Sequence, residues 1–240
     1  MTRAIDLVVL DMAGTTVRDD GLVEQAFARA DAETGVSGDM PWEQALAYVR
    51  DTMGQSKIDV FTHLAGGDLA RAERATTAFE AAFADAVAAG AAEEIPGAGD
   101  VLRALRAEGY AIALTTGFSP ATRDGILDAL GWRNLADVAL APADAGRGRP
   151  APDLVWTAAL RTGATAAARI AVVGDTASDV ESGLRAGAGL VVGVLTGAHD
   201  RAALEAAGAH VVIDDVTQLP EVLASARVGA APLAVAGVVA

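Results

Sequence analysis

The chain has 240 residues, which is enough for one large domain or for a core domain with a smaller one. Its 18 basic and 32 acidic residues give a formal net charge of −14, which argues against nucleic acid or an acidic membrane as a partner because both are polyanions. Cysteine is absent, so disulfides, thiolate metal sites and cysteine nucleophiles are excluded. No apolar run is long enough to span a membrane and the N-terminus does not resemble a signal peptide, so we expect a cytoplasmic globular protein.

The first stretch with a chemical signature is LVVLDMAGTTV, residues 7–17. A short apolar run that ends near a glycine is typical of a buried parallel strand, and the carboxyl ends of such strands carry the chemistry of open α/β sheets. We therefore expect Asp11 at the end of a central strand, with Gly14 allowing the backbone to turn closely around it. On this stretch alone, an aspartate that caps the next helix is the ordinary alternative.

A helical insertion is predicted between this strand and the remainder of the chain. Apolar residues recur at helical spacing over residues 23–63, and the Ala-rich stretch 68–93 carries Phe79, Phe83 and Val87 at four-residue steps. No strand-like run interrupts the stretch, which ends at the sequence EIPG. The predicted domains are a core of residues 1–18 and 96–240 and a helical cap of residues 19–95.

Beyond the insertion, strand and helix patterns alternate. Strands are predicted at residues 111–115, 138–141, 170–173, 190–194 and 211–213, and helices at 101–108, 120–130, 153–162, 178–186, 199–207 and 216–223. This alternation predicts an α/β fold with a doubly wound, Rossmann-like parallel sheet. The small apolar residues 227–240 are not assigned.

Polar side chains follow the predicted strands at points that share one edge of such a sheet. They are Asp11, the threonines and glycine of 115–117, the arginines Arg147 and Arg149 of GRGRP, and the acids Asp175 and Asp179 of VVGDTASD. Crowded carboxylates require a counter-charge, and oxygen ligands with room for water and a phosphate oxygen suit Mg²⁺. A hydroxyl and an arginine beside the ion favour a phosphoryl group as the substrate, which Asp11 can attack to form an aspartyl phosphate. Each motif alone has an ordinary reading as a turn, a surface loop or a helix cap, so the prediction rests on their combination.

The order D-x-A-G-T, T-T-G, a basic residue before proline, and G-D-T-x-S-D resembles the haloacid dehalogenase superfamily over nearly the whole chain. Within it, the sequence is similar to the phosphonatase branch, which comprises phosphonoacetaldehyde hydrolase and phosphonatase-like hydrolases. Ala13 stands where phosphatases of the superfamily have aspartate, and Arg149 stands where lysine is usual. The stretch MGQSKID, residues 53–59, resembles the cap segment that carries the Schiff-base lysine of this branch, here Lys57.

The resemblance implies a role for each matching residue. Asp11 and Lys57 would be catalytic; Thr116, Gly117, Arg149 and Met53 would bind the phosphate or substrate; Asp11, the Ala13 carbonyl, Asp175 and Asp179 would hold or support Mg²⁺. Arg147 is the alternative if the alignment of GRGRP is shifted by two residues. The resemblance also implies an organophosphonate or phosphate as the small-molecule substrate and a homodimer formed through the cap.

These features agree with cleavage of a carbon–phosphorus bond. Ala13 cannot protonate a departing alkoxide, whereas a lysine that forms an iminium with an aldehyde can withdraw electrons from a P–C bond. Lys57 would have to be neutral to do so, which burial under a closed cap could achieve, although a solvated helix lysine is the ordinary alternative. The branch has a histidine and a tyrosine where this chain has Val60 and Phe118, and His63 lies around the helix from Lys57.

The leading hypothesis is a Mg²⁺-dependent hydrolase of phosphonoacetaldehyde or a close analogue, acting through aspartyl-phosphate and lysine Schiff-base intermediates. A phosphatase for small phosphate monoesters, in which Lys57 only binds substrate, is the alternative, and Ala13 counts against it. A signalling module with a phosphorylatable aspartate has a similar sheet, but a cap of this size serves to enclose a small molecule. A non-enzymatic binding protein is disfavoured because no central acid is missing. Closure of the cap about hinges at 19–21 and 96–97 is a further hypothesis.

Overall fold

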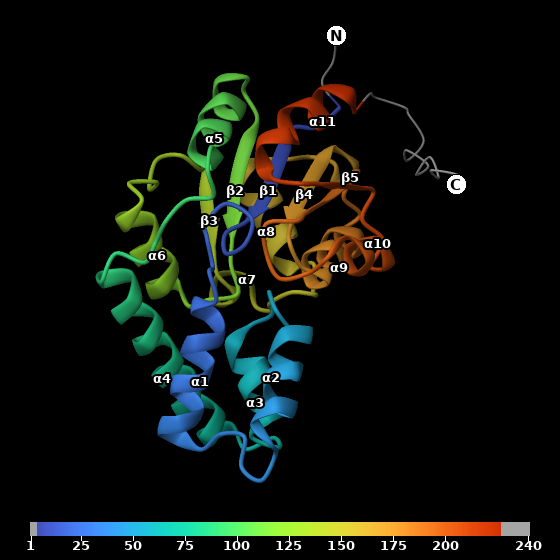
Figure 1. The fold of residues 1–240 in the computed structure, drawn as a ribbon. Helices are drawn as coiled ribbons and strands as arrows, with labels where there is room; N and C mark the ends of the chain where they lie inside the picture. The colour runs from blue at the N-terminus through green and yellow to red at the C-terminus, as the bar shows by residue number, and fades with distance from the viewer. Residues whose placement is uncertain (1–3, 227–240) are drawn as a thin grey trace.

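The computed structural model describes residues 4–226, and its centre is a six-stranded parallel sheet with the order β3-β2-β1-β4-β5-β6 (Figure 1). The strands are β1 (Leu7–Asp11), β2 (Ala111–Thr115), β3 (Val138–Leu140), β4 (Ile170–Gly174), β5 (Leu190–Val194) and β6 (Val211–Ile213). After β1, the chain adds β2 and then β3 on one side of it. The chain then crosses to the other side of β1, where it adds β4, β5 and β6. The change of direction lies between β1 and β4, where open α/β sheets form their binding crevice.

Helices cover both faces of the sheet because side chains alternate along each strand. Leu7 and Val9 pack into one apolar cluster with α8 (Asp153–Thr162), α9 (Ala177–Ala186) and α10 (Arg201–Ala206). Val8 and Leu10 pack into a second cluster with α5 (Ala98–Ala107), α6 (Pro120–Ala129) and α11 (Leu219–Ser225). The predicted doubly wound α/β fold is therefore confirmed.

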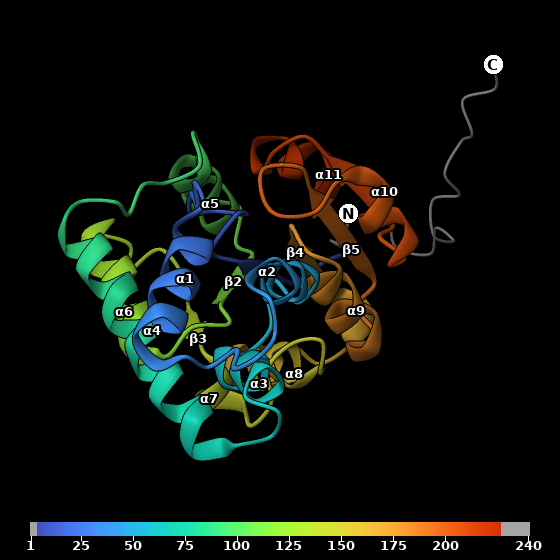
Figure 2. The same cartoon turned by 60° about the horizontal axis from the view of Figure 1, so that its bottom comes forward.

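Four helices form the insertion after β1, as the sequence predicts: α1 (Leu22–Thr34), α2 (Trp42–Asp51), α3 (Lys57–Leu64) and α4 (Leu69–Ala88). They lie together beyond the end of the sheet at which β1 leads into them (Figures 1 and 2). Phe27 of α1 is the centre of their aromatic core, with ring centroids 4.7 Å from Phe61 and 4.8 Å from Phe79. The boundaries 19–95 for the cap and 1–18 with 96–240 for the core stay a prediction.

The structure refines the sequence prediction in several places. The helical pattern over 23–63 forms three helices, because the chain reverses at Gly35 and Gly38, which have positive φ, and again between α2 and α3 at Gly54. Helix α4 ends at Ala88, before the predicted end at residue 93, and Val87 near its end is only half-buried. The short helix α7 (Pro142–Ala145) and the 3₁₀ turn η1 (Ala167–Arg169) were not predicted. The predicted helix over 216–223 begins as the 3₁₀ turn η2 (Val216–Gln218) and continues as α11. The segment 227–240 lies outside the described residues.

No helix among residues 4–226 combines the length and the apolar character needed to cross a bilayer.

One carboxylate joins the cap to the core. Glu80 of α4 accepts hydrogen bonds from the backbone N–H of Ser119 at 3.1 Å, from the Ser119 hydroxyl at 2.6 Å and from the Thr122 hydroxyl. Ser119 is the N-cap of α6, where the helix dipole favours a negative charge. Glu80 therefore holds α4 against the loop that connects β2 to α6.

Replacement of Glu80 by alanine is expected to weaken this contact and to lower the stability of the chain by about 1–2 kcal/mol, because the polar groups of Ser119 and Thr122 lose their acceptor. For a chain of this size, the corresponding decrease in Tm is roughly 2–8 °C. Thermal unfolding of Glu80→Ala measures it. Glu73→Ala, on the exposed side of the same helix, is the matched control, and equal shifts for the two variants would show that Glu80 does not join the cap to the core.

Candidate active site

Asp11 is the last residue of the central strand β1 and is almost fully buried. The backbone turns sharply after it: the carbonyl of Met12 accepts hydrogen bonds from the N–H groups of Thr15, Thr16 and Val17. Gly14 has φ +86°, and a Cβ at this position would lie 2.4 Å from an oxygen of Asp175. Glycine at this position therefore allows the turn to approach the second acid of the site.

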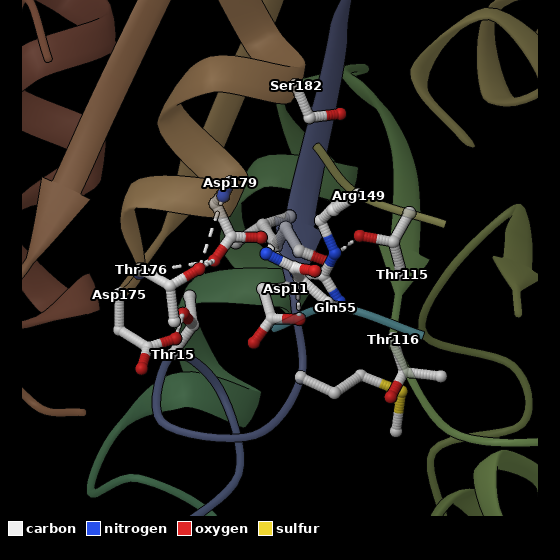
Figure 3. Close-up of polar contacts among 12 residues, drawn as sticks. Asp11, Thr15, Gln55, Thr115, Thr116, Arg149, Asp175, Thr176, Asp179 and Ser182 are labelled. Carbon is white, nitrogen blue, oxygen red and sulfur yellow. Dashed lines mark hydrogen bonds and ion pairs between the residues drawn. The ribbon is translucent and has the colours of Figure 1, made fainter. Parts of the chain in front are cut away.

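Three carboxylates converge at this edge of the sheet. Oxygens of Asp11, Asp175 and Asp179 lie within 4.8 Å of one another, and all three residues are buried (Figure 3). Asp175 follows β4 and accepts hydrogen bonds from the Thr15 hydroxyl at 3.0 Å and the Ala198 N–H at 2.8 Å. Asp11 thus lies at the end of β1, Asp175 directly after β4 and Asp179 in the first turn of α9.

Asp179 is fixed by the start of α9 as well as by its charge partners. It forms a capping box with Thr176: the Asp179 N–H donates to the Thr176 hydroxyl oxygen, and the Asp179 carboxylate accepts from the Thr176 N–H, each at 3.2 Å. Its other oxygen accepts from the guanidinium of Arg149. Thr15 and Thr176 were not among the predicted site residues, although their places within G-T-T and G-D-T-x-S-D indicate local bonding of this kind.

Burial and the charges of neighbouring carboxylates both raise the pKa values of Asp11 and Asp175. Burial raises the pKa of Asp175 to about 6, and the charge of Asp179 adds to the effect. Burial also raises the pKa of Asp11 well above its usual range, although the charge of Arg149 opposes it. A cation that neutralises the carboxylates would lower both pKa values and keep Asp11 ionised.

The residues present fit a small, hard cation. Asp11, Asp175 and Asp179 supply only oxygen donors, which Mg²⁺ prefers, and one guanidinium cannot balance three buried carboxylates. Ala13, the fourth predicted metal residue, lines a small cavity together with Asp11 and Asp175. Asp11, Asp175 and the Ala13 carbonyl would hold the ion, and Asp179 would support it.

Arg149 is the buried guanidinium of the site. Its Nη1 donates to Asp11 Oδ1 at 2.5 Å and to Asp179, and these two carboxylates raise its pKa although burial opposes the charge. Its Nε and Nη2 are buried without a hydrogen-bond partner among residues 4–226. Buried donors without acceptors are costly, so an anion with several oxygens is the complementary ligand. Arg147, the alternative considered from the sequence, instead pairs with Asp153 at the surface.

Two further predicted residues, Thr116 and Gly117, lie in the loop after β2. Thr116 is buried, its N–H donates to the Leu140 carbonyl, and its hydroxyl accepts from the Phe118 N–H. A Cβ on Gly117 would lie 2.5 Å from the backbone oxygen of Gln55 in the cap. Gly117 therefore lets the cap backbone approach the core loop, a contact that the sequence pattern did not indicate.

The cap contributes Lys57, the first residue of α3, whose side chain is only about 5% exposed. Its Nζ lies 3.4 Å from the Gln55 carbonyl oxygen and 5.3–5.8 Å from the ring centroids of Phe27, Phe79 and Phe118. Burial in this apolar environment lowers the pKa of Lys57 to about 8, and the nearby charge of Arg149 acts in the same direction.

Lys57 is also the only lysine among the 18 basic residues of the chain, the others being arginines. Arginine serves at the exposed basic positions, but it cannot be deprotonated in proteins and so cannot replace a lysine that must be neutral. This count is the clearest sequence signal for a special role of Lys57, and motif matching alone does not use it.

The predicted residues from core and cap meet around one cavity of about 30 Å³. Asp11, Thr116, Arg149 and Asp175 line it from the core, and Met53 and Lys57 line it from the cap. Val60 and Phe118 are buried and apolar, and His63 stacks on Tyr48 at 3.9 Å on the exposed side of the cap. The arrangement places a buried carboxylate, a guanidinium with two unpaired donors and an amine of lowered pKa around the same small cavity.

Comparisons with known proteins agree with this geometry. Residues 5–187 match the family described as haloacid dehalogenase-like hydrolase. A protein named probable phosphatase IndB from Dickeya dadantii is 30% identical over 217 residues, which cover 89% of this chain and 91% of that protein. The phosphonoacetaldehyde hydrolase of Bordetella pertussis is 30% identical over 258 residues, which cover 92% and 91% of the two chains.

Solved structures show the same architecture. A hydrolase from Pseudomonas syringae superposes with a TM-score of 0.80 at 24% identity, covering 92% of this chain and all of that one. A haloacid dehalogenase family hydrolase from Deinococcus radiodurans, solved with bound phosphate and sodium, superposes with a TM-score of 0.65 at 28% identity, covering 93% and 96%. The chain therefore belongs to the haloacid dehalogenase-like hydrolases.

Proposed function

We propose that this protein is a Mg²⁺-dependent hydrolase that cleaves the P–C bond of phosphonoacetaldehyde or a close analogue. The observation that carries the proposal is the position of Lys57: the only lysine of the chain is buried, has a pKa of about 8 and lines the same cavity as Asp11 and Arg149. A small phosphorylated substrate is implied by the family, and relatives named phosphonoacetaldehyde hydrolase are 30% identical over more than nine-tenths of the chain.

In the proposed reaction, Lys57 of the cap acts on the aldehyde carbon and Asp11 of the core acts on phosphorus. The neutral amine of Lys57 adds to the aldehyde carbon and, with loss of water, forms an iminium. Asp11 then attacks phosphorus; the P–C bond breaks, its electron pair forms the C=C bond of an enamine, and the iminium nitrogen becomes neutral. The enamine takes a proton at carbon and is hydrolysed from Lys57 as acetaldehyde, and water hydrolyses the aspartyl phosphate.

The binding residues orient this chemistry. The unpaired Nε and Nη2 donors of Arg149 would bind phosphoryl oxygens, together with Thr116 and Gly117 in the loop after β2. Mg²⁺ held by the carboxylates would supply positive charge to the phosphoryl oxygens and keep Asp11 ionised. Met53 would pack against the substrate from the cap side of the cavity.

A second candidate is a phosphatase for small phosphate monoesters, favoured by the 30% identity to the protein named probable phosphatase IndB. In that reaction Lys57 would only bind substrate. Ala13 has no proton to give an alkoxide leaving group, and a buried amine of low pKa is a weaker anion-binding group than arginine, so this candidate ranks second.

Phosphate release is the test that separates the candidates. With Mg²⁺ present, phosphonoacetaldehyde should release inorganic phosphate, and Lys57→Met should reduce this rate by at least about 10³-fold because no iminium can form. Methionine fits the apolar surroundings of Lys57 and removes a buried cation, so the variant should unfold at no lower temperature than the wild type. Turnover of phosphate monoesters but not of the phosphonate would contradict the proposal and support the phosphatase.

The pH dependence of Lys57 reactivity gives an independent prediction. Because the pKa is lowered to about 8, the neutral fraction of Lys57 should rise as the pH approaches 8 and level off above it. Trapping of an acetaldehyde imine with cyanoborohydride across pH 6–11, followed by peptide mapping, measures this fraction. In the urea-unfolded chain the same lysine should titrate near the ordinary value of about 10.4. A midpoint near that value in the folded protein would show that burial does not activate the amine.

A further inference from the structure

Iminium formation requires more than a neutral lysine. The amine and the aldehyde first form a carbinolamine, whose hydroxyl leaves readily only when an acid protonates it. Hydrolysis of the later iminium requires a base that takes a proton from water. Two apolar residues have no proton to transfer: Phe118 in the loop after β2, whose ring lies near the amine, and Val60, which follows Lys57 by three residues in α3.

Most polar groups whose charge acts on Lys57 are already engaged. Arg149 does not release its proton, and Asp11 is bonded to Arg149 and serves as the nucleophile. Glu80 accepts three hydrogen bonds from Ser119 and Thr122. Of the charged groups acting on Lys57, Asp19 is left as the one that can exchange a proton near the amine.

Asp19 lies in the linker between β1 and α1, at the junction of two spaces. It lines the cavity of about 30 Å³ together with Lys57 and Asp11. It also lines a larger cleft of about 630 Å³ between the cap and the loop that contains His199. Because Asp19 is half-buried and lines both spaces, water can reach it from the cleft while the residue borders the cavity that Lys57 lines.

The local structure holds this carboxyl group in place. Asp19 Oδ1 accepts a hydrogen bond from the Val23 N–H at 2.9 Å, at the start of α1. Burial raises the pKa of Asp19, partly offset by this hydrogen bond and by the charge of Lys57, whereas the charges of Glu24 and Asp20 raise it further. A carboxyl group with a raised pKa carries a proton in a larger share of molecules near neutral pH, as a general acid requires.

We propose that Asp19 is a catalytic acid–base residue of the lysine half-reaction, an inference that rests on the proposed function. As a carboxylic acid, Asp19 donates its proton to the carbinolamine hydroxyl; the C–O bond breaks, water leaves, and the nitrogen lone pair of Lys57 forms the C=N bond. After P–C cleavage and protonation of the enamine at carbon, which regenerates an iminium, the Asp19 carboxylate takes a proton from the water that attacks the iminium carbon, which restores the acid.

The test isolates imine formation from phosphoryl transfer. Acetaldehyde carries no phosphorus, so the rate of its reductive trapping on Lys57 reports the lysine step alone. We expect Asp19→Asn to slow this rate by about 100-fold, a typical loss for a general acid. Asparagine keeps an oxygen that can accept from the Val23 N–H, so this hydrogen bond at the start of α1 should remain. Asp19→Ser, whose hydroxyl can also accept a hydrogen bond but is not an acid, serves if the first variant does not fold.

Asp20→Asn is the matched control, because the neighbouring residue is exposed and the same charge is removed. Its trapping rate should stay within about twofold of the wild type. An electrostatic role alone predicts the opposite sign for Asp19→Asn: the negative charge of Asp19 raises the pKa of Lys57, so its removal would leave more neutral amine and speed the reaction.

The outcomes separate this inference from the proposed function. Wild-type trapping with an unchanged or faster rate in Asp19→Asn would overturn the role of Asp19 and leave the hydrolase proposal standing. No adduct in the wild type with either acetaldehyde or phosphonoacetaldehyde would overturn both. A slow rate in Asp19→Asn and Asp19→Ser with a normal rate in Asp20→Asn is the result that the inference requires.

Discussion

Buried charge at the edge of the sheet is the constraint on which the rest of this structure depends. Asp11, Asp175 and Asp179 lie within one small volume, and Arg149 is the only guanidinium bonded among them within residues 4–226. Such a cluster costs stability unless further charges complete it, because desolvated carboxylates repel one another. A divalent cation and a phosphoryl group would supply the missing partners for the acids and for the two donors of Arg149 that lack an acceptor within residues 4–226.

The insertion adds a buried amine, Lys57, to the carboxylates and the guanidinium of the core. Glu80 and the close approach of Gly117 to the Gln55 carbonyl hold the cap on the loop after β2, and Phe118 of that loop lies over Lys57. The packing of the cap on the core therefore buries the amine of Lys57, and this burial lowers its pKa, although the charge of Glu80 acts in the opposite direction.

Much of the fold could be read from the sequence because strands and helices alternate with clear periodicity, and β2, β5, β6 and α8 have the predicted bounds. The strand order and the breaks between the cap helices depend on packing between distant segments. The hydrophobic periodicity of a single segment does not predict such packing. At the site, Asp11 and Asp175 were predicted because each stands at the end of an apolar strand. Arg149 and Lys57 were predicted because GRGRP and MGQSKID resemble segments of the family. Asp19 and Glu80 were missed because they carry no motif; their positions follow only from how the linker and α4 pack against the core.

The most direct test of the account is borohydride reduction of the protein during turnover of phosphonoacetaldehyde with Mg²⁺, followed by peptide mass mapping. Imine formation followed by P–C cleavage leaves an ethyl group on Lys57 after reduction, and the account predicts this adduct in the wild type. In Asp11→Asn, which cannot accept the phosphoryl group, the reduced adduct on Lys57 should retain the phosphonate. The absence of any adduct on Lys57, with phosphate esters still hydrolysed, would contradict the account.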